Sequence, residues 1–400
     1  MRRRVISLVI VSLLAFILAG CGNSAGNQPT AAQNSPYVIN TILSLTGQGA
    51  FLGQEEQKSL QALEKEINAG GGINGHPVQF AIADDQTSPK VAVQLATGLM
   101  AKNVQVILGP TLVGMANAVE ALATNGPVVY AVTPGIQPAP HSYVYSASTN
   151  THDLIRALLN YFRSQGWTKI ASLTSTDASG QDGLKGIQAA MKLPENSSMK
   201  LVDQEYFDVT ATSVSSQIAK IKSSGAQALL VWTTGTPAGT AFKGITQGGL
   251  NIPVGTTDGN ATYAEMNQYK DFLPAKLYIA SARWIAGESL PPGPARDIET
   301  NFHKALASAG LKPDLPTSIV WDPANIIVNV LKKLGPNATA AQIRDAIDNI
   351  HGYEGVDGTY TFSPTDHRGL SLQSVYVTRW DAGQGTWVSI SGPGGSPLKK

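Results

Sequence analysis

A helix, a tight turn and a strand meet in one short stretch, Glu66-Ile67-Asn68-Ala69-Gly70-Gly71-Gly72-Ile73-Asn74-Gly75-His76-Pro77-Val78. Before it, apolar residues in 54–68 recur with the spacing of one helix face. The three glycines end that helix, and Asn74-Gly75 begins a turn into an apolar strand at 78–83. Adjacent glycines also occur in phosphate-binding loops, but those loops open a helix and carry a lysine that this stretch lacks. The stretch therefore predicts a helix-turn-strand unit.

The same alternation of helix and strand continues along the chain. Unbroken apolar runs predict strands at 38–43, 104–108, 128–132, 169–173 and 228–232. Helical patterns stand between these runs and end at glycines such as Gly166 and Gly225, while Ser88-Pro89 has the residues of an N-cap and a first-turn proline. Apolar strands separated by helices are typical of parallel sheets covered on both faces. The sequence predicts an α/β fold with parallel central sheets.

Length and composition limit the possible classes of protein. The chain has 400 residues, and the folded pattern from Tyr37 to about residue 390 is too long for one hydrophobic core, so we expect two lobes. The net charge is +1 and no basic run follows the N-terminal segment, which gives no support for binding to nucleic acid. Charged residues make up 14% of the chain, which suits buried sheets joined by tight turns.

The N-terminal segment has the parts of a secretory signal. Three arginines at 2–4 precede an apolar run at 5–18 that is shorter than the ~20 residues of a membrane-spanning helix. Leu18-Ala19-Gly20-Cys21 resembles the bacterial lipobox, in which the cysteine is acylated. A buried cysteine in an ordinary signal is the alternative. We expect a signal peptide at 1–20, lipidation at Cys21, and a flexible tether at 21–36 that is rich in small and polar residues.

Short polar residues follow the predicted strands. They are Thr46-Gly47, Gly109-Pro110-Thr111, Thr133-Pro134-Gly135, Thr174-Ser175-Thr176-Asp177, Thr233-Thr234-Gly235 and Thr257-Asp258-Gly259. Ligands of parallel sheets bind beside these carboxyl ends, and hydroxyls with glycine-exposed amides suit a small polar solute. Asp84-Asp85 follows another strand, where a strand-end cap is favoured over a metal pair.

The sequence contains no assembled catalytic set. Neither a Gly-x-Ser-x-Gly elbow nor a His-Glu-x-x-His motif occurs. The histidines at 76, 141, 152, 303, 351 and 367 have no metal-ligand spacing, and the single cysteine excludes a disulfide within the chain or a cysteine metal site. We therefore expect no enzyme, no bound metal and no cofactor.

Several blocks together resemble one family. The opening stretch, Asp84 to Pro89, Gly109-Pro110, Asp177 to Gly183 and Tyr353 to Phe362 are similar, in order and spacing, to the branched-chain amino-acid binding proteins. The resemblance implies the type I periplasmic-binding fold, with two Rossmann-like lobes joined by a three-strand hinge. The hinge crossovers are expected near Ala147, Arg283 and Gly355. The first lobe then comprises 37–147 plus 283–355, and the second comprises 148–282 plus 356–395.

The resemblance also implies a ligand site in the cleft between the lobes. The implied ligand-binding residues are Phe51, Leu52, Thr111, Leu112, Val113, Gly114, Thr133, Gly135, Gln137, Ser179, Thr234, Thr236 and Asp258. The resemblance places Leu112, Val113 and Gln137 where relatives carry the hydroxyls that hold a ligand carboxylate. Backbone amides near Gly114 and Gly135, with Thr111 and Thr133, are the alternative anion clamp. Asp258 matches the acid that holds the ligand ammonium group.

These features together predict an exported, membrane-anchored solute receptor. It would serve an ABC importer of the branched-chain or hydrophobic amino-acid family by closing its lobes on a small solute, with permease subunits as partners. Close relatives take aromatic carboxylates, short amides or urea, so these solutes remain alternatives. A sensory receptor for a membrane partner is the second alternative, and an extracellular hydrolase is the third.

Overall fold

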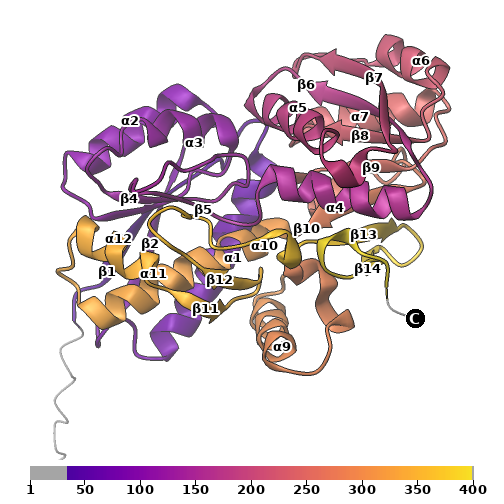
Figure 1. The fold of residues 1–400 in the computed structure, drawn as a ribbon. Helices are drawn as coiled ribbons and strands as arrows, with labels where there is room; N and C mark the ends of the chain where they lie inside the picture. The colour runs from indigo at the N-terminus through magenta and orange to yellow at the C-terminus, as the bar shows by residue number, and fades with distance from the viewer. Residues whose placement is uncertain (1–33, 399–400) are drawn as a thin grey trace, which may run out of the picture. The chain divides into compact units, whose positions relative to one another are not determined.

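The computed structural model describes residues 34–398. The predicted signal peptide, Cys21 and nearly all of the predicted tether lie outside these residues. Among the described helices, none combines the length and apolar composition that crossing a membrane requires. The described chain contains two large sheets, and we use "first lobe" and "second lobe" for the elements that pack on each sheet (Figure 1).

The first lobe is built on a parallel sheet of five strands in the order β2-β1-β3-β4-β5. The strands are β1 (Tyr37–Leu43), β2 (Val78–Asp84), β3 (Val106–Leu108), β4 (Val128–Ala131) and β5 (Val144–Ser146). Successive residues on a strand point to opposite faces. Ile107 and Val129 thus pack in one apolar cluster with α2 (Pro89–Met100) and α3 (Val113–Glu120). Leu108 and Tyr130 pack in another cluster on the opposite face.

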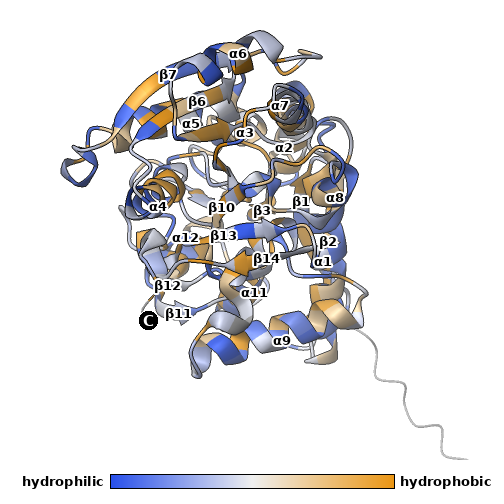
Figure 2. Cartoon of the chain, turned by 90° about the vertical axis from the view of Figure 1, so that its right-hand side faces the viewer, coloured by the Kyte–Doolittle hydropathy of each residue, from blue (hydrophilic) through white to orange (hydrophobic). Residues whose placement is uncertain are grey.

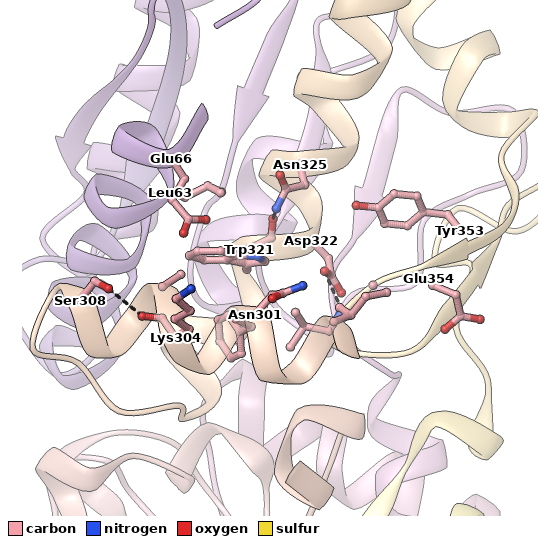
Figure 3. A pocket seen from close by; sticks show the side chains of 15 residues that line it. Leu63, Glu66, Asn301, Lys304, Ser308, Trp321, Asp322, Asn325, Tyr353 and Glu354 are labelled. Atoms are coloured by element: carbon pink, nitrogen blue, oxygen red, sulfur yellow. Dashed lines mark hydrogen bonds between the residues drawn. The ribbon is translucent and has the colours of Figure 1, made fainter. Parts of the chain in front are cut away.

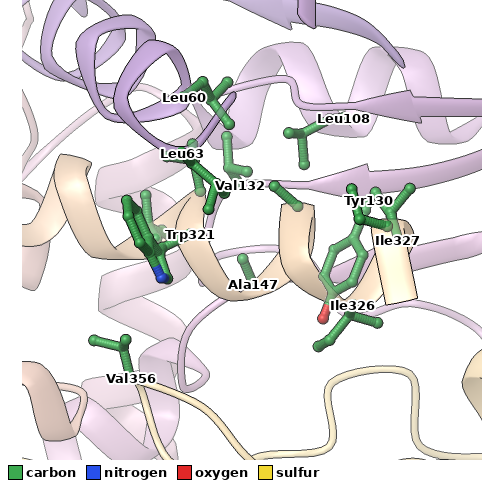
Figure 4. Packing of buried hydrophobic residues seen from close by; sticks show 14 of the residues in the cluster. Leu60, Leu63, Leu108, Tyr130, Val132, Ala147, Trp321, Ile326, Ile327 and Val356 are labelled. Atoms are coloured by element: carbon green, nitrogen blue, oxygen red, sulfur yellow. The ribbon is translucent and has the colours of Figure 1, made fainter. Parts of the chain in front are cut away.

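Helices from both ends of the chain cover that opposite face. They are α1 (Ala50–Ala69), α9 (Pro294–Ser308), α10 (Leu315–Ile319), α11 (Trp321–Leu334) and α12 (Ala340–Asp348). Figure 4 shows Leu63 of α1 near Trp321 of α11, and Ile327 of α11 beside the strand residue Tyr130. Helix α9 shows mostly hydrophilic colour in Figure 2, but its buried Phe302 joins the same cluster.

The second lobe is built on a seven-stranded sheet in the order β14-β13-β10-β9-β8-β6-β7. Its strands are β6 (Lys169–Ser175), β7 (Lys200–Phe207), β8 (Ala228–Trp232), β9 (Val254–Thr256), β10 (Leu277–Ser281), β13 (Tyr376–Asp381) and β14 (Thr386–Ser389). Helices α4 (Thr151–Ser164) and α5 (Ala178–Ala190) cover one face of this sheet. The other face is covered by α6 (Ser215–Ser223), α7 (Thr236–Gln247) and α8 (Tyr263–Gln268). The last two strands are antiparallel, which the sequence did not predict.

The chain returns to the second sheet later than predicted. After Gly355, the buried residues Val356, Tyr360, Phe362 and Leu370 still belong to the first lobe's apolar cluster, and β13 begins only at Tyr376. The hairpin of β11 (His351–Glu354) and β12 (Thr359–Thr361) therefore belongs to the first lobe. Its turn is fixed because the Asp322 carboxylate on α11 accepts the backbone N–H groups of residues 356 and 357 at 2.9 and 2.8 Å.

Five short 3₁₀ segments complete the described secondary structure. They are η1 (Pro194–Asn196), η2 (Asp258–Asn260), η3 (Arg283–Ser289), η4 (Leu372–Ser374) and η5 (Pro393–Gly395). The predicted α/β fold with parallel-dominated sheets in two lobes is confirmed. Ser88 occupies the N-cap of α2 and Pro89 its first turn, as predicted, although the Ser88 side chain caps no backbone amide.

Candidate functional site

A narrow cavity lies between the carboxyl ends of the strands in the two lobes. Its volume is about 30 Å³, which is room for roughly one water molecule. The lining residues are Leu52, Glu56, Thr111, Leu112, Val113, Val132, Thr133, Pro134, Thr151, Ser179, Asp182, Trp232, Thr234, Thr257, Asp258, Gly259, Leu315 and Ile319. The lobes are thus close together, and a solute of amino-acid size requires the cavity to widen.

On the first-lobe side, a chain of hydrogen bonds ends at a buried acid. The backbone N–H of Ser44 donates to Thr111 Oγ1 at 3.1 Å, and Thr111 Oγ1 donates to Glu56 Oε2 at 2.6 Å. The Glu56 side chain lies on α1 and is 1% exposed. Burial, together with the nearby carboxylates of Asp85 and Asp314, raises the pKa of Glu56 to about 8 against the hydrogen bond from Thr111.

The same side of the cavity carries the beginning of a helix. Leu112 is the N-cap residue of α3 and Val113 is the first helical residue, and no side chain caps this helix end. The first N–H groups of a helix have no partner within the helix and attract negative charge. The N-terminus of α3 is therefore the part of the cavity that suits an anionic group.

On the second-lobe side, Asp258 follows β9 and is 0% exposed. Its Oδ1 accepts the Thr257 hydroxyl at 3.1 Å, and its Oδ2 accepts the Ser148 hydroxyl at 3.4 Å. Burial raises the pKa of Asp258 to about 7, although these hydrogen bonds and the charge of Arg368 act in the opposite direction. Burial likewise raises the pKa of Asp182, a third acid at the cavity.

Apolar side chains form the rest of the wall. Leu52 and Leu112 contribute from the first lobe, Trp232 from the second, and Leu315 and Ile319 from α10. The residues described as lining the cavity include three acids and no Lys, Arg or His. The cavity therefore suits a small amphipathic solute that brings its own positive charge.

The two lobes touch at the rim of the cavity. Thr236 N donates to the carbonyl oxygen of Gln48 at 3.4 Å, and a Cβ on Gly235 would lie 2.2 Å from the same oxygen. Beside this contact, Phe51 of the first lobe meets Tyr269 of the second edge-on, with ring centroids 6.0 Å apart. Glycine at 235 thus permits a backbone approach that any side chain would block.

Eight of the predicted site residues line the cavity: Leu52, Thr111, Leu112, Val113, Thr133, Ser179, Thr234 and Asp258. Phe51, Gly114, Gly135 and Thr236 lie close by but do not line it. Gln137 is exposed and borders a separate hollow with Asn150 and His152, so the structure does not support its predicted place in the cavity.

The sequence reading missed the acids Glu56 and Asp182, and the α10 residues Leu315 and Ile319. Glu56 left a detectable signal, because it falls in the buried stripe of α1 between Leu52 and Leu60, where an apolar residue is expected. The predicted strand-end caps are confirmed: Asp84 Oδ1 accepts the N–H of residue 45, and Asp85 Oδ1 accepts the Ser44 hydroxyl. No cluster of three or more metal-ligating side chains occurs in residues 34–398.

A wider hollow of about 480 Å³ lies within the first lobe, between α1, α9, α11 and β11 (Figure 3). Figure 3 shows Trp321 and Asp322 beside it, and the Asp322 oxygens are already held by the backbone of the following hairpin. Only first-lobe elements line this hollow, so a solute bound there would not bridge the two sheets.

Comparison with known proteins gives one consistent result. Residues 36–385 match the family described as periplasmic binding protein. Leu/Ile/Val-binding protein homolog 1 of Brucella abortus (strain 2308) is 25% identical over 369 residues, which cover 86% of this chain and 91% of that protein.

Two solved structures share the fold. The substrate binding protein LivJ of a branched-chain amino acid transporter from Streptococcus pneumoniae, in complex with isoleucine, superposes with a TM-score of 0.75 at 20% identity, covering 88% of this chain and 99% of that chain. A solute binding protein of an ABC transporter from R. palustris, in complex with benzoate, has a TM-score of 0.75 at 18% identity, covering 91% and 98%. The chain belongs to the periplasmic binding protein family, and within it resembles the Leu/Ile/Val-binding proteins.

Proposed function

We propose that this protein is a lipid-anchored, extracytoplasmic receptor that delivers a small amphipathic solute to an ABC importer. The favoured solute is a hydrophobic amino acid or a close analogue with an ammonium group. Asp258 carries this proposal, because a carboxylate that is 0% exposed at an apolar cavity is costly unless a positive group pairs with it. The α3 N-terminus supports the carboxylate end of the same solute.

Lobe closure is the proposed means of capture. The cavity is lined from both sheets, so a solute bound there contacts both lobes and stabilises the closed arrangement relative to the open one. Closure would also bring the rims of both lobes together for the permease to recognise. Family membership supports a binding role rather than catalysis.

A thermal-shift screen of amino acids, aromatic acids and short amides, followed by calorimetry, tests the solute class. We expect hydrophobic amino acids to raise the melting temperature more than benzoate does, because benzoate brings no cation to Asp258. Benzoate binds a fold relative. If benzoate raises the melting temperature of this protein more than any amine does, the favoured solute class becomes the aromatic carboxylates. Turnover of a candidate solute would contradict the binding role.

The lipid anchor has its own test. Cys21→Ser should release a fully folded, soluble protein from membranes, because the substitution removes the thiol that would carry the acyl chains. Membrane fractionation with Ser24→Ala as the control measures this release. A Cys21→Ser protein that stays in the membrane fraction as completely as the unmodified chain would contradict acylation at Cys21.

A further inference from the structure

The side chains of Leu112 and Val113 offer no hydrogen-bond donor on the first-lobe side of the cavity. Thr111 offers none either. A hydroxyl has one proton, and the Thr111 hydroxyl accepts from Ser44 N at 3.1 Å and donates to Glu56 Oε2 at 2.6 Å. Its donor is therefore committed within the protein and is not offered to a solute.

These two hydrogen bonds define which oxygen of Glu56 carries the proton when the side chain is neutral. Oε2 accepts the Thr111 proton, so in the neutral carboxylic acid the acidic proton is on Oε1. Glu56 lines the cavity and is 1% exposed, which favours the neutral acid over the carboxylate. Such an acid offers a donor to the cavity from the first lobe, opposite the acceptor Asp258 of the second.

We propose that Glu56, kept neutral by its burial and oriented by the Ser44–Thr111 relay, donates its Oε1 proton in a hydrogen bond to the carboxylate of the bound solute. This inference rests on the proposed function and specifies its solute as a carboxylate. Glu56 and the α3 N-terminus then form the anion clamp, while Asp258 distinguishes amino acids from acids without an amine.

The charged surroundings of Glu56 fit this role. Asp85, at the end of β2, and Asp314, before α10, are the charged groups that act on it from the packed elements, and Asp182 and Asp258 face the same cavity from the second lobe. All four are acidic, and the charges of Asp85 and Asp314 disfavour ionisation of Glu56. The pKa of Glu56, raised to about 8 by burial, agrees with a neutral side chain at pH 7.

Glu56→Gln and Glu56→Leu distinguish a donor from an ionised acid. Glutamine accepts the Thr111 proton through its oxygen and keeps an N–H donor for the cavity, whereas leucine offers neither. With isoleucine and benzoate as probes in calorimetry at about pH 7, we expect Glu56→Gln to retain Kd within about threefold and Glu56→Leu to weaken it by at least about tenfold. Glu55→Gln, on the outer side of the same helix turn, is the control.

The pH profile supplies the second measurement. Wild-type affinity for either carboxylate should fall about tenfold between pH 7 and pH 9, as Glu56 loses its proton and repels the anion, while Glu56→Gln should show no such loss. Titration of the ligand changes the affinity of both proteins equally. The difference between their pH profiles therefore reports the titration of Glu56. Urea unfolding of each variant confirms that the substituted proteins are folded.

Three results would overturn the inference. Equal losses of affinity in Glu56→Gln and Glu56→Leu would indicate that Glu56 is ionised and pairs with a cation. Unchanged affinity in a folded Glu56→Leu protein would make it a purely structural residue. Failure of both carboxylates to bind wild type would exclude the carboxylate clamp, while an amide found in the screen would still support the proposed receptor. Absence of binding by the whole screen would reject the proposed function itself.

Discussion

Asp258 shows how one residue sets the chemistry of the cavity. Its carboxyl group is buried, is held by Thr257 and Ser148, and faces no basic residue among those that line the cavity. Sequence reasoning found Asp258 from the family motif at a strand end. It could not reveal the degree of burial, because the apolar wall around Asp258 comes from Trp232 and from the distant helix α10.

Removing this carboxylate should weaken binding of an amine-bearing solute. We expect Asp258→Asn to lower the affinity for isoleucine by on the order of 2–5 kcal/mol, since the ammonium group would lose its buried partner. Benzoate affinity should stay the same or improve. Calorimetry with Asp271→Asn, an exposed acid of the second lobe, provides the matched control. Full affinity of Asp258→Asn for isoleucine would show that the ammonium group is held elsewhere.

The protonation of Asp258 should make this binding pH-dependent. Its pKa is raised to about 7 in the free protein, so below pH 7 an ammonium ligand must displace a proton to form the ion pair. Isoleucine affinity should therefore fall as the pH is lowered from about 7 to about 5, with proton release detected in calorimetry buffers of different ionisation enthalpy. A pH-independent affinity over this range would contradict the ion pair.

At the scale of elements, the sequence predicts the strands well because buried parallel strands are continuous apolar runs. The run 228–232 coincides with β8. The crossover predicted near Gly355 put β11 in the first lobe but β12 in the second. These strands are short and partly exposed, and only contacts with the first lobe's core fix the place of the hairpin. The part of the site on α10 was missed for the same reason, since five residues carry no clear helical period.

The loop before α7 offers a test of closure that leaves the cavity intact. A Cβ on Gly235 would meet the Gln48 carbonyl oxygen at 2.2 Å, so Gly235→Ala should hold the lobes apart and weaken solute binding by about tenfold or more. X-ray scattering with saturating solute should then give a larger radius of gyration than for wild type.

Gly225→Ala is the matched control for this substitution. Its φ of +71° resembles the +78° of Gly235, but nothing lies within 4 Å of the added Cβ. Both variants place an alanine at positive φ, although Gly235, with a ψ of −151°, carries the larger backbone strain, and only Gly235→Ala adds a clash between lobes. If the two substitutions weaken binding equally, the loss of affinity is due to backbone strain and not to hindered closure of the lobes.

Across the whole molecule, buried acids set the dependence of stability on pH. Burial raises the pKa of Asp258 and Asp314 to about 7, of Glu56 to about 8, and of Glu299 to about 9. Folding therefore binds protons that the unfolded chain releases above about pH 4. This contribution to stability is fully present below the unfolded pKa values and is lost as the pH rises through the folded ones.

The free protein should consequently be more stable in mild acid than in mild base. We expect the free energy of unfolding at about pH 5.5 to exceed that at about pH 8.5 by at least about 2 kcal/mol. Urea denaturation at the two pH values measures the difference, and Glu56→Gln should reduce it by removing one of the titrating groups. Higher stability at pH 8.5 would show that these acids are ionised at little cost in the folded protein.

The late return of the chain to the second sheet constrains how the protein is made. The first lobe's core joins Ile39 to Leu370, and the second sheet is completed only by β13 and β14. A ribosome must therefore finish nearly the entire chain before either core can close, and the early segments meanwhile expose strand edges and apolar faces. We expect such a chain to remain largely unfolded until synthesis is nearly over, and a truncation before residue 370 to leave both cores incomplete.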